Sequence, residues 1–308
     1  MSPGQASPGR GQLPNFLLIG AQKAGTTSLY HYLGQHPEIF MSPEKEPRFF
    51  AFEGHALDFA GPGNERLRTT TTTLAAYQQL FSGVRDERAV GEASVVYLHH
   101  PRVAPAIAAA IPDAKIVAVL RNPVERAYSG FLYHSRDGYE EAVTFEEALR
   151  LEPGRLAAGW YPGWGYREQG FYFRHLTPYF ALFPRSQIRV VLYEDLEVDP
   201  DGLVADLFGF LGVDPGFRPD TSIRWNPSGL PRSARGQRLM TGRRPVKEAI
   251  KRVIPARIGH RIVDRLQTAN LERPPIRQET RADLVAGYAA DIDQLEALIG
   301  RDLSAWRS

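Results

Sequence analysis

The chain has 308 residues and no cysteine, which excludes disulfide bonds, thiolate metal ligands and a cysteine nucleophile. It also lacks any apolar run of the roughly 18 to 20 residues that a membrane-spanning helix needs, so we expect no membrane span. Its 37 basic and 35 acidic side chains nearly cancel, leaving a formal net charge of +2. Bulk charge therefore gives no reason to expect a nucleic-acid partner. Because no membrane span is predicted, we expect a cytoplasmic protein. No feature of the sequence predicts an oligomeric state.

The composition favours one globular domain behind a short tail. Residues 1–14, MSPGQASPGRGQLP, lack the apolar core of a secretory signal, and we expect them to form a flexible tail. With 43% hydrophobic residues in the chain, residues 15–308 are enough to bury a single core. Short apolar runs predict buried strands at 16–20, 115–120 and 188–192. Because helical patterns stand between these strands, we expect the α/β class, with a P-loop-like central parallel sheet flanked by helices on both faces.

Several local patterns predict where helices begin. Thr73 ends a run of threonines and is expected to cap the helix that follows it. Asn122 is expected to cap a second helix, whose first residue is Pro123. Thr144 and Glu147 form a capping-box pattern at the start of a third.

Prolines and one apolar stripe complete the predicted order of elements. Because prolines at 43 and 47 push their neighbours to extended conformations, we expect no helix within 39–52. Pro178 is expected to interrupt an aromatic helix over 170–183. A closing helix carries an apolar stripe that we expect to pack in the core, formed by Leu284, Tyr288, Ile292, Leu295 and Leu298.

The stretch NFLLIGAQKAGTTSLYHYL contains the most informative pattern. Gly20 and Gly25 are spaced G-x-x-x-x-G at the end of an apolar strand, as in loops that bind phosphate with backbone N–H groups and the start of a helix. A nucleoside triphosphatase has lysine directly after the second glycine. This chain has Thr26 there and carries Lys23 inside the loop. The loop therefore predicts an anion site with unusual chemistry.

Residues after two other strands are expected to join this loop, because the carboxyl ends of parallel strands meet at one edge of a sheet. Arg121 follows the strand at 115–120, where its charge repels a metal ion. Glu194 and Asp195, in the turn 193–195, leave a magnesium-dependent kinase or hydrolase open. A sulfuryl group carries less charge than a phosphoryl group, so a lysine in the loop can offset the charge of a leaving phosphate without a metal ion. We therefore favour sulfuryl transfer and expect no metal site.

Two separated motifs then support a family resemblance. GAQKAGTTSLYHYL resembles the 5′-phosphosulfate loop of PAPS-dependent sulfotransferases, especially the heparan-sulfate enzymes and their bacterial relatives. IVAVLRNPVERAYSGFLYH resembles their 3′-phosphate strand and helix, and the likeness extends through YEDL, NPSGLPRS and LIGRDLSAW. The resemblance implies transfer of a sulfuryl group from 3′-phosphoadenosine 5′-phosphosulfate (PAPS), with release of PAP. The implied acceptor is a hydroxyl, or less readily an amine, of a carbohydrate, glycosylated compound or natural product.

The resemblance also implies roles for residues that match the family motifs. Lys23 would contact the sulfuryl group and the leaving phosphate. The 5′-phosphate would be bound by Gly25, Thr26, Thr27 and Ser28. The 3′-phosphate would be bound by Arg121 and Ser129, and a loosely matched Lys-Gly-Arg loop would contribute Arg235 and Gly236.

The extended segment SPEKEPRFF matches the family stretch that carries the catalytic base. Glu46 stands three residues before Phe49, at the place of that base, and Glu44 is the alternative. Arg48 would steady the sulfuryl group or the acceptor. The heparan-sulfate enzymes have a lysine where this chain has Ala93, so acceptor binding must differ. Glu92 beside it is expected to bind the acceptor or an arginine.

Two other functions stay open from the sequence. One is the P-loop kinase or hydrolase with a displaced lysine, and the other is a non-catalytic module that binds PAP as a scaffold. Residues 232–252 hold eight basic side chains and one acid, as a solvated helix face or as a surface for an anionic ligand. The aromatic segment 159–173 either lines an acceptor groove or packs as a loop. The sequence does not specify the acceptor.

Overall fold

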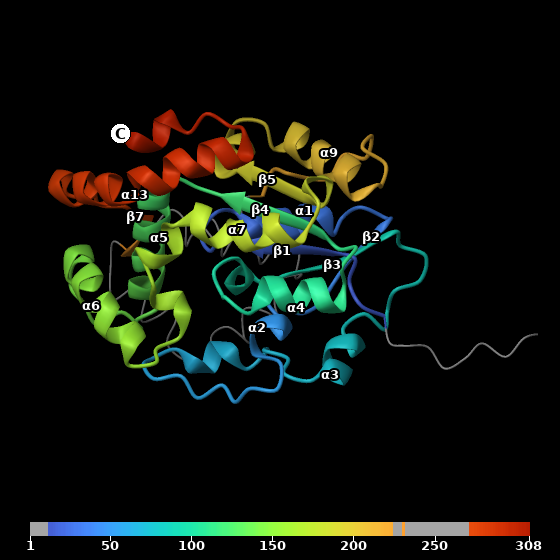
Figure 1. Cartoon of the computed structure of the whole chain (residues 1–308), viewed down its shortest axis with the longest axis horizontal. Helices are drawn as coiled ribbons and strands as arrows, with labels where there is room; N and C mark the ends of the chain where they lie inside the picture. The colour runs from blue at the N-terminus through green and yellow to red at the C-terminus, as the bar shows by residue number, and fades with distance from the viewer. Residues whose placement is uncertain (1–11, 224–229, 232–270) are drawn as a thin grey trace, which may run out of the picture.

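The computed structural model describes residues 12–223, 230–231 and 271–308. Its centre is a parallel sheet of five strands in the order β2-β3-β1-β4-β5 (Figure 1). The strands are β1 (Phe16–Gly20), β2 (Ile39–Met41), β3 (Ala89–Ala93), β4 (Lys115–Leu120) and β5 (Ile188–Leu192). A separate antiparallel pair consists of β6 (Leu230–Pro231) and β7 (Leu271–Glu272). The expected central parallel sheet is confirmed.

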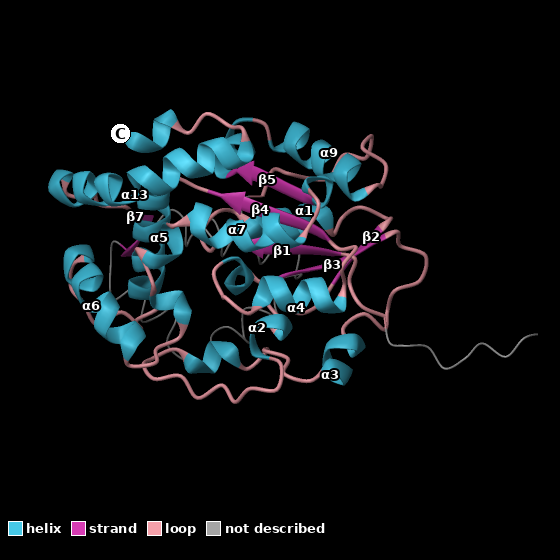
Figure 2. Ribbon diagram, in the orientation of Figure 1, coloured by secondary structure: helices cyan, strands magenta, loops and turns pink. Residues whose placement is uncertain are grey.

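Helices cover both faces of this sheet (Figure 2). In the view of Figure 1, α4 and α7 pack together in front of the sheet, and α1 packs with α9 on the other face. The helices are α1 (Thr26–Leu33), α2 (Phe49–Phe52), α3 (Leu74–Gln79), α4 (Val103–Ala110), α5 (Pro123–Arg136), α6 (Phe145–Ala157), α7 (Tyr172–Leu182), α8 (Tyr193–Val198), α9 (Pro200–Leu211) and α13 (Gln278–Ile299). Short 3-10 helices near the site are η1 (Asn64–Leu67), η2 (Val95–Leu98), η3 (Pro162–Trp164) and η4 (Glu168–Gly170). Within the described ranges, no helix combines the length and apolarity that crossing a membrane requires.

The apolar runs form strands because the fold buries them on both faces. Every residue of β1 is buried, and every residue of β4 after Lys115 is buried. Parallel strands with both faces covered need no alternation of polar and apolar residues, which explains the continuous runs. The stripe on α13 packs inward as expected, with Leu298 only partly buried and the other four members buried.

The predicted helix caps form. The Asn122 side chain accepts hydrogen bonds from the N–H groups of Val124 (3.0 Å) and Glu125 (3.3 Å). Thr73 caps α3, and the Thr144 hydroxyl caps α6 by accepting from the Glu147 N–H at 3.2 Å. The reciprocal half of the capping box differs, because the Glu147 carboxylate accepts from the Val143 N–H.

Three expectations about proline and turns were wrong. Residues 49–52, FFAF, form α2, because the prolines restrict the chain only up to residue 47 and burial of all four side chains stabilises the turn. Helix α7 runs through Pro178 without interruption, since its buried residues Tyr172, Leu176 and Tyr179 hold it to the core. The expected turn at 193–195 is the start of helix α8.

Candidate functional site

Two neighbouring cavities lie where the strands end. The first, which we call the loop cavity, has a volume of about 350 Å³. Its lining consists of Gln22, Lys23, Gly25, Thr26, Thr27, Ser28, Tyr32, Lys45, Glu46, Val95, Arg121, Tyr133, Tyr193, Leu196, Glu197, Pro200, Thr221 and Arg273. The second, which we call the aromatic cavity, has a volume of about 810 Å³. Its lining consists of Gln22, Thr27, Lys45, Glu46, Arg48, Pro62, Gly63, Asn64, Arg66, Leu67, Thr69, Val95, Tyr133, His134, Asp137, Tyr139, Tyr161 and Trp164. The residues common to both linings mark their junction: Gln22, Thr27, Lys45, Glu46, Val95 and Tyr133.

The turn between β1 and α1 shapes the loop cavity. Gly25 precedes α1 at a φ of 90°, and a Cβ added there would lie 2.8 Å from Leu196 Cδ2, so this position needs glycine. Thr26, Thr27 and Ser28 form the first turn of α1 and line the cavity. Backbone N–H groups and the positive end of the helix dipole favour an anion at such a helix start.

Lys23 points its ammonium group toward the junction of the cavities. Its Nζ lies 4.4 Å from the centroid of the Tyr133 ring, a contact that holds a cation over an aromatic face. Burial, together with the guanidinium groups of Arg136 and Arg121, lowers the pKa of Lys23 to about 7. Lys23 is therefore a cation that changes charge close to neutral pH unless an anion binds beside it.

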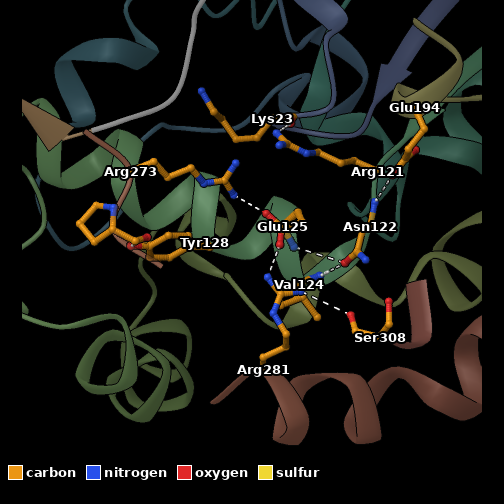
Figure 3. Close-up of polar contacts among 11 residues, drawn as sticks. Lys23, Arg121, Asn122, Val124, Glu125, Tyr128, Glu194, Arg273, Arg281 and Ser308 are labelled. Carbon is orange, nitrogen blue, oxygen red and sulfur yellow. Dashed lines mark hydrogen bonds and ion pairs between the residues drawn. The ribbon is translucent and has the colours of Figure 1, made fainter. Parts of the chain in front are cut away.

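Arginines provide further positive charge to the loop cavity. Arg121 donates a hydrogen bond to the Lys23 carbonyl oxygen at 3.1 Å, and its guanidinium lies 4.4 Å from the Tyr193 ring centroid. Figure 3 shows Arg273 and Arg281 both reaching Glu125 in the first turn of α5, with Arg121 nearby. Arg273 was not predicted from the sequence, because no motif marks it and only the fold brings it to the cavity.

The aromatic cavity and the loop cavity are both lined by the ring of Tyr133. The guanidinium of Arg66, on η1, lies 4.7 Å from the Tyr133 centroid and 4.1 Å from the Tyr139 centroid, and Arg66 forms an ion pair with Asp137. Three cations, Lys23, Arg66 and Arg136, thus lie within 5.1 Å of the centroid of the Tyr133 ring. Within the segment 159–173, Tyr161 and Trp164 line this cavity, whereas other aromatic residues, such as Tyr166 and Tyr172, are buried in the packed loop.

Glu46 lies at the junction with its carboxylate held in place. Its Oε2 accepts a hydrogen bond from the Val95 N–H at 3.3 Å and lies 3.4 Å from Arg48 Nε. Its Oε1 lies 3.7 Å from Lys45 Nζ. Arg48 also donates to the Thr70 hydroxyl at 3.3 Å and lines the aromatic cavity. The carboxylate is therefore oriented by one N–H group and two cations.

A histidine in the aromatic cavity is a weaker candidate base. His134 is buried and lines the aromatic cavity, and its Nδ1 lies 3.0 Å from the Tyr166 hydroxyl. Burial, with a further contribution from Arg66, lowers the pKa of His134 to about 3. An imidazole with so low a pKa has little affinity for a proton, so His134 is poorly suited to act as a general base.

Glu194 and Asp195 serve the fold. The Glu194 carboxylate accepts hydrogen bonds from the Asn122 N–H at 3.2 Å and from the Trp306 indole at 3.1 Å. Asp195 forms a bidentate ion pair with Arg301 and accepts a hydrogen bond from the Leu192 N–H. Neither acid lines the loop cavity, which removes the feature that kept a magnesium-dependent kinase open. In the part of the chain that the structure describes, no three His, Asp or Glu side chains are grouped to hold a metal ion.

The structure gathers most of the residues that the sequence singled out. Lys23, the start of α1, Arg121 and Glu46 meet at the loop cavity, and Arg48 joins them in the aromatic cavity. Glu44 lines neither cavity, and Ser129 is fully buried in α5 outside both linings. Arg235, Gly236 and the basic segment 232–252 lie outside the described residues.

The expectation for Glu92 was wrong. Its side chain is fully buried in β3 and is hydrogen-bonded to the hydroxyls of Tyr77 and Ser94. It lines neither cavity. The position of β3 explains this, because the strand is covered on both faces and every one of its residues is buried.

Comparison with known proteins identifies the family. A model described as the sulfotransferase family matches residues 14–218, more than half of the chain. The chain belongs to the sulfotransferase family. The structure is similar to that of a sulfotransferase from Alicyclobacillus acidocaldarius, with a TM-score of 0.76 and 38% sequence identity over 96% of this chain and 100% of that one. Sulfotransferases of this family take the sulfuryl group from PAPS and release PAP, which agrees with the expected cofactor.

Two human relatives are named as sulfotransferases of heparan sulfate. The chain is 30% identical over 214 residues to heparan sulfate glucosamine 3-O-sulfotransferase 6 of Homo sapiens. It is also 30% identical over 228 residues to bifunctional heparan sulfate N-deacetylase/N-sulfotransferase 3 of Homo sapiens. The matches cover 68% and 70% of this chain but only 55% and 24% of those relatives. The chain thus matches part of each relative.

The lowered pKa of Lys23 predicts that PAP affinity depends on pH. Above pH 7 the free protein has largely lost the proton of Lys23, whereas the phosphate of bound PAP raises the lysine pKa. Binding therefore takes up a proton, and affinity falls by up to about tenfold per pH unit above 7 until the pKa of the bound state is reached. Calorimetric titration with PAP between pH 6 and 9, in buffers of different ionisation enthalpy, measures both effects.

The Lys23→Ala variant is the control for this titration, because it retains the titration of the PAP phosphates alone. The wild-type protein should show the steeper loss of affinity above pH 7. Equal slopes in both proteins, without proton uptake at pH 8, would contradict the assignment of the lowered pKa to Lys23.

Proposed function

We propose that the protein transfers the sulfuryl group of PAPS, bound in the loop cavity, to a hydroxyl of an acceptor bound in the aromatic cavity. An amine is the second candidate for the acceptor group. The position of Glu46 carries this proposal, because its carboxylate lines both cavities. A base at that junction can take a proton from a hydroxyl on one side while the hydroxyl oxygen attacks sulfur on the other.

The loop cavity suits a nucleotide with phosphates at two positions. The first turn of α1 would bind the 5′-phosphate through Gly25, Thr26, Thr27 and Ser28. Arg121 and Arg273 would bind the 3′-phosphate, for which a guanidinium fork is well suited. The proposal keeps the other 3′-phosphate ligands that the resemblance implies, namely Ser129, Arg235 and Gly236.

The transfer step uses charges that the site already holds. Glu46 accepts the hydroxyl proton as the acceptor oxygen forms its bond to sulfur. The bond between sulfur and the bridging oxygen breaks in line, and the electron pair stays on the 5′-phosphate of PAP. The Lys23 ammonium stabilises this developing charge, and Arg48 steadies Glu46 and the sulfuryl oxygens. This mechanism requires no divalent ion.

The aromatic cavity supports an acceptor that contains a ring. Its walls present four tyrosine and tryptophan side chains, Tyr133, Tyr139, Tyr161 and Trp164, and four neutral hydrogen-bonding side chains, Gln22, Thr27, Asn64 and Thr69. Aromatic faces with hydrogen-bonding groups between them suit a sugar ring or the ring of a natural product. We therefore propose a carbohydrate, glycosylated or natural-product acceptor. The proposal includes a cytoplasmic location and no nucleic-acid partner.

Ligand-dependent thermal stability distinguishes this function from the kinase alternative. A PAPS-dependent enzyme should be stabilised by PAP to the same extent with and without EDTA, since cations of the protein bind the phosphates. A kinase or hydrolase should respond most to ATP with Mg²⁺. Melting curves with PAP, ATP, and ATP plus Mg²⁺ compare these directly, and a response to ATP with Mg²⁺ alone would refute the proposal.

Glutamine substitutions test the base and the scaffold alternative together. Glu46→Gln should lower transfer from radiolabelled PAPS to a panel of 4-nitrophenyl glycosides and oligosaccharides by about 10²–10⁴-fold, because an amide cannot take the proton. PAP affinity should stay near the wild-type value. Glu44→Gln is the matched control and should leave turnover unchanged, since Glu44 lines neither cavity.

Other results would favour a different account. A larger loss in Glu44→Gln than in Glu46→Gln would make Glu44 the base. PAP binding by the wild-type protein without turnover of any acceptor in the panel would support the scaffold.

A further inference from the structure

A buried carboxyl group lies beneath α2. Glu92 stands in β3 with 0% of its surface exposed. Its Oε1 accepts a hydrogen bond from the Tyr77 hydroxyl at 3.2 Å, and its Oε2 accepts one from the Ser94 hydroxyl at 2.8 Å. The Tyr97 hydroxyl is hydrogen-bonded to the same carboxyl group. Among the described residues, hydroxyl groups hold this acid where a buried carboxylate would ordinarily be paired with a cation.

Two of these hydroxyls also accept hydrogen bonds from the backbone of residues 48 and 50, which closely follow Glu46 in the chain. The Arg48 N–H donates to Ser94 Oγ at 2.9 Å, and the Phe50 N–H donates to the Tyr97 hydroxyl at 3.2 Å. A hydroxyl has one hydrogen, so a hydroxyl that donates to a carboxylate keeps its lone pairs for an N–H donor. Ionised Glu92 can only accept, and it therefore sets the orientation of both hydroxyls.

The two N–H groups belong to the start of α2, where a helix cannot pair its own first N–H groups. Arg48 precedes α2 at a φ of 56°, in the left-handed region that is unfavourable for a residue with a Cβ, and its side chain does not cap the helix. Hydrogen bonds from outside the helix therefore hold Arg48 in this conformation. Because the Arg48 guanidinium contacts the Glu46 carboxylate, the conformation of Arg48 also affects where Glu46 is held.

We propose that Glu92 is a positioning residue of the sulfuryl transfer. It acts through Ser94 and Tyr97 to fix the backbone of Arg48 and Phe50, which places Glu46 at the junction of the two cavities. Glu92 touches neither substrate, since it lines neither cavity. This inference rests on the proposed role of Glu46 as the base.

Stability alone does not account for an acid at this place. Burial raises the pKa of Glu92 to about 7, although its hydrogen bonds to Tyr97, Ser94 and Tyr77 oppose the rise. Because the pKa is higher in the folded protein than in the unfolded chain, ionisation of Glu92 costs stability, and the cost grows as pH rises toward 7 and then stays constant. A neutral glutamine of the same shape removes that cost. Glutamine also carries N–H donors, so it cannot accept from all three hydroxyls.

The test compares Glu92→Gln with the wild-type protein in activity, stability and amide exchange. We expect kcat for transfer from PAPS to the best 4-nitrophenyl glycoside to fall about 10- to 100-fold, with PAP affinity within about threefold of wild type. The melting temperature at pH 8 should not fall. Hydrogen exchange of the Arg48 and Phe50 amides, followed by NMR, should be at least about tenfold faster. The exchange measurement needs no acceptor.

Two further variants separate a positioning role from a general effect of altering a buried acid. Glu152→Gln is the matched control, because Glu152 is also buried and accepts hydrogen bonds from the backbone N–H groups of Arg167 and Glu168, outside both cavities. It should leave kcat unchanged. Ser94→Ala should lower kcat, and the double variant Glu92→Gln/Ser94→Ala should lose less than the product of the two single effects, since both act through one network.

Specific outcomes would overturn the inference. They are an unchanged kcat in Glu92→Gln, unchanged exchange of the Arg48 and Phe50 amides, or fully multiplicative losses in the double variant. These outcomes are distinct from a failure of the proposed function. That failure would appear as no PAP binding or no transfer in the wild-type protein, or as full activity in Glu46→Gln.

Discussion

The site depends on one constraint, a cation held inside an anion-binding turn at the edge of a parallel sheet. The turn from β1 into α1 is tight enough to require glycine at position 25, and it places Lys23 within the loop at a positive φ of 67°. In a triphosphatase the equivalent lysine follows the loop and works with a metal ion. Here Lys23 lines the loop cavity, and its ammonium group lies 4.4 Å from the ring centroid of Tyr133, a residue common to both cavities.

The rest of the site is arranged around the junction of the two cavities. The Tyr133 ring contacts both Lys23 and Arg66, and Tyr133 lines both the loop cavity and the aromatic cavity. Glu46 is oriented by Val95, Lys45 and Arg48, and the Glu92 network lies beneath the same segment. Polar groups that would be unfavourable in an ordinary core are thus concentrated under the residues that line the two cavities.

Short-range patterns made much of this predictable from the sequence. The strand at 16–20, the tight turn from Gly20 to Gly25, the Asn122 cap and the position of Arg121 each follow from a few adjacent residues, and the structure has them as expected. Arg273 was missed because it reaches the loop cavity from a segment far away in the chain. The wall formed by η1 was missed for the same reason.

Burial also changed what local patterns predicted. Burial of Ala51 and of the three phenylalanines at 49, 50 and 52 turned an expected extended segment into α2. The side chain of Glu92, expected at the acceptor, points into the core because β3 is a central strand with both faces covered. Such outcomes depend on which elements pack together, which is information that neighbouring residues in a sequence do not carry.

The most direct test of the account is a single-turnover measurement on the Lys23→Ala variant. Wild type and variant are saturated with PAPS and mixed with the same acceptor, and the rate of sulfuryl transfer is followed without added metal. If the ammonium group stabilises the leaving phosphate, the rate should fall by about 10²–10³-fold while the variant remains folded. A transfer rate within a few-fold of wild type would contradict the central role of Lys23.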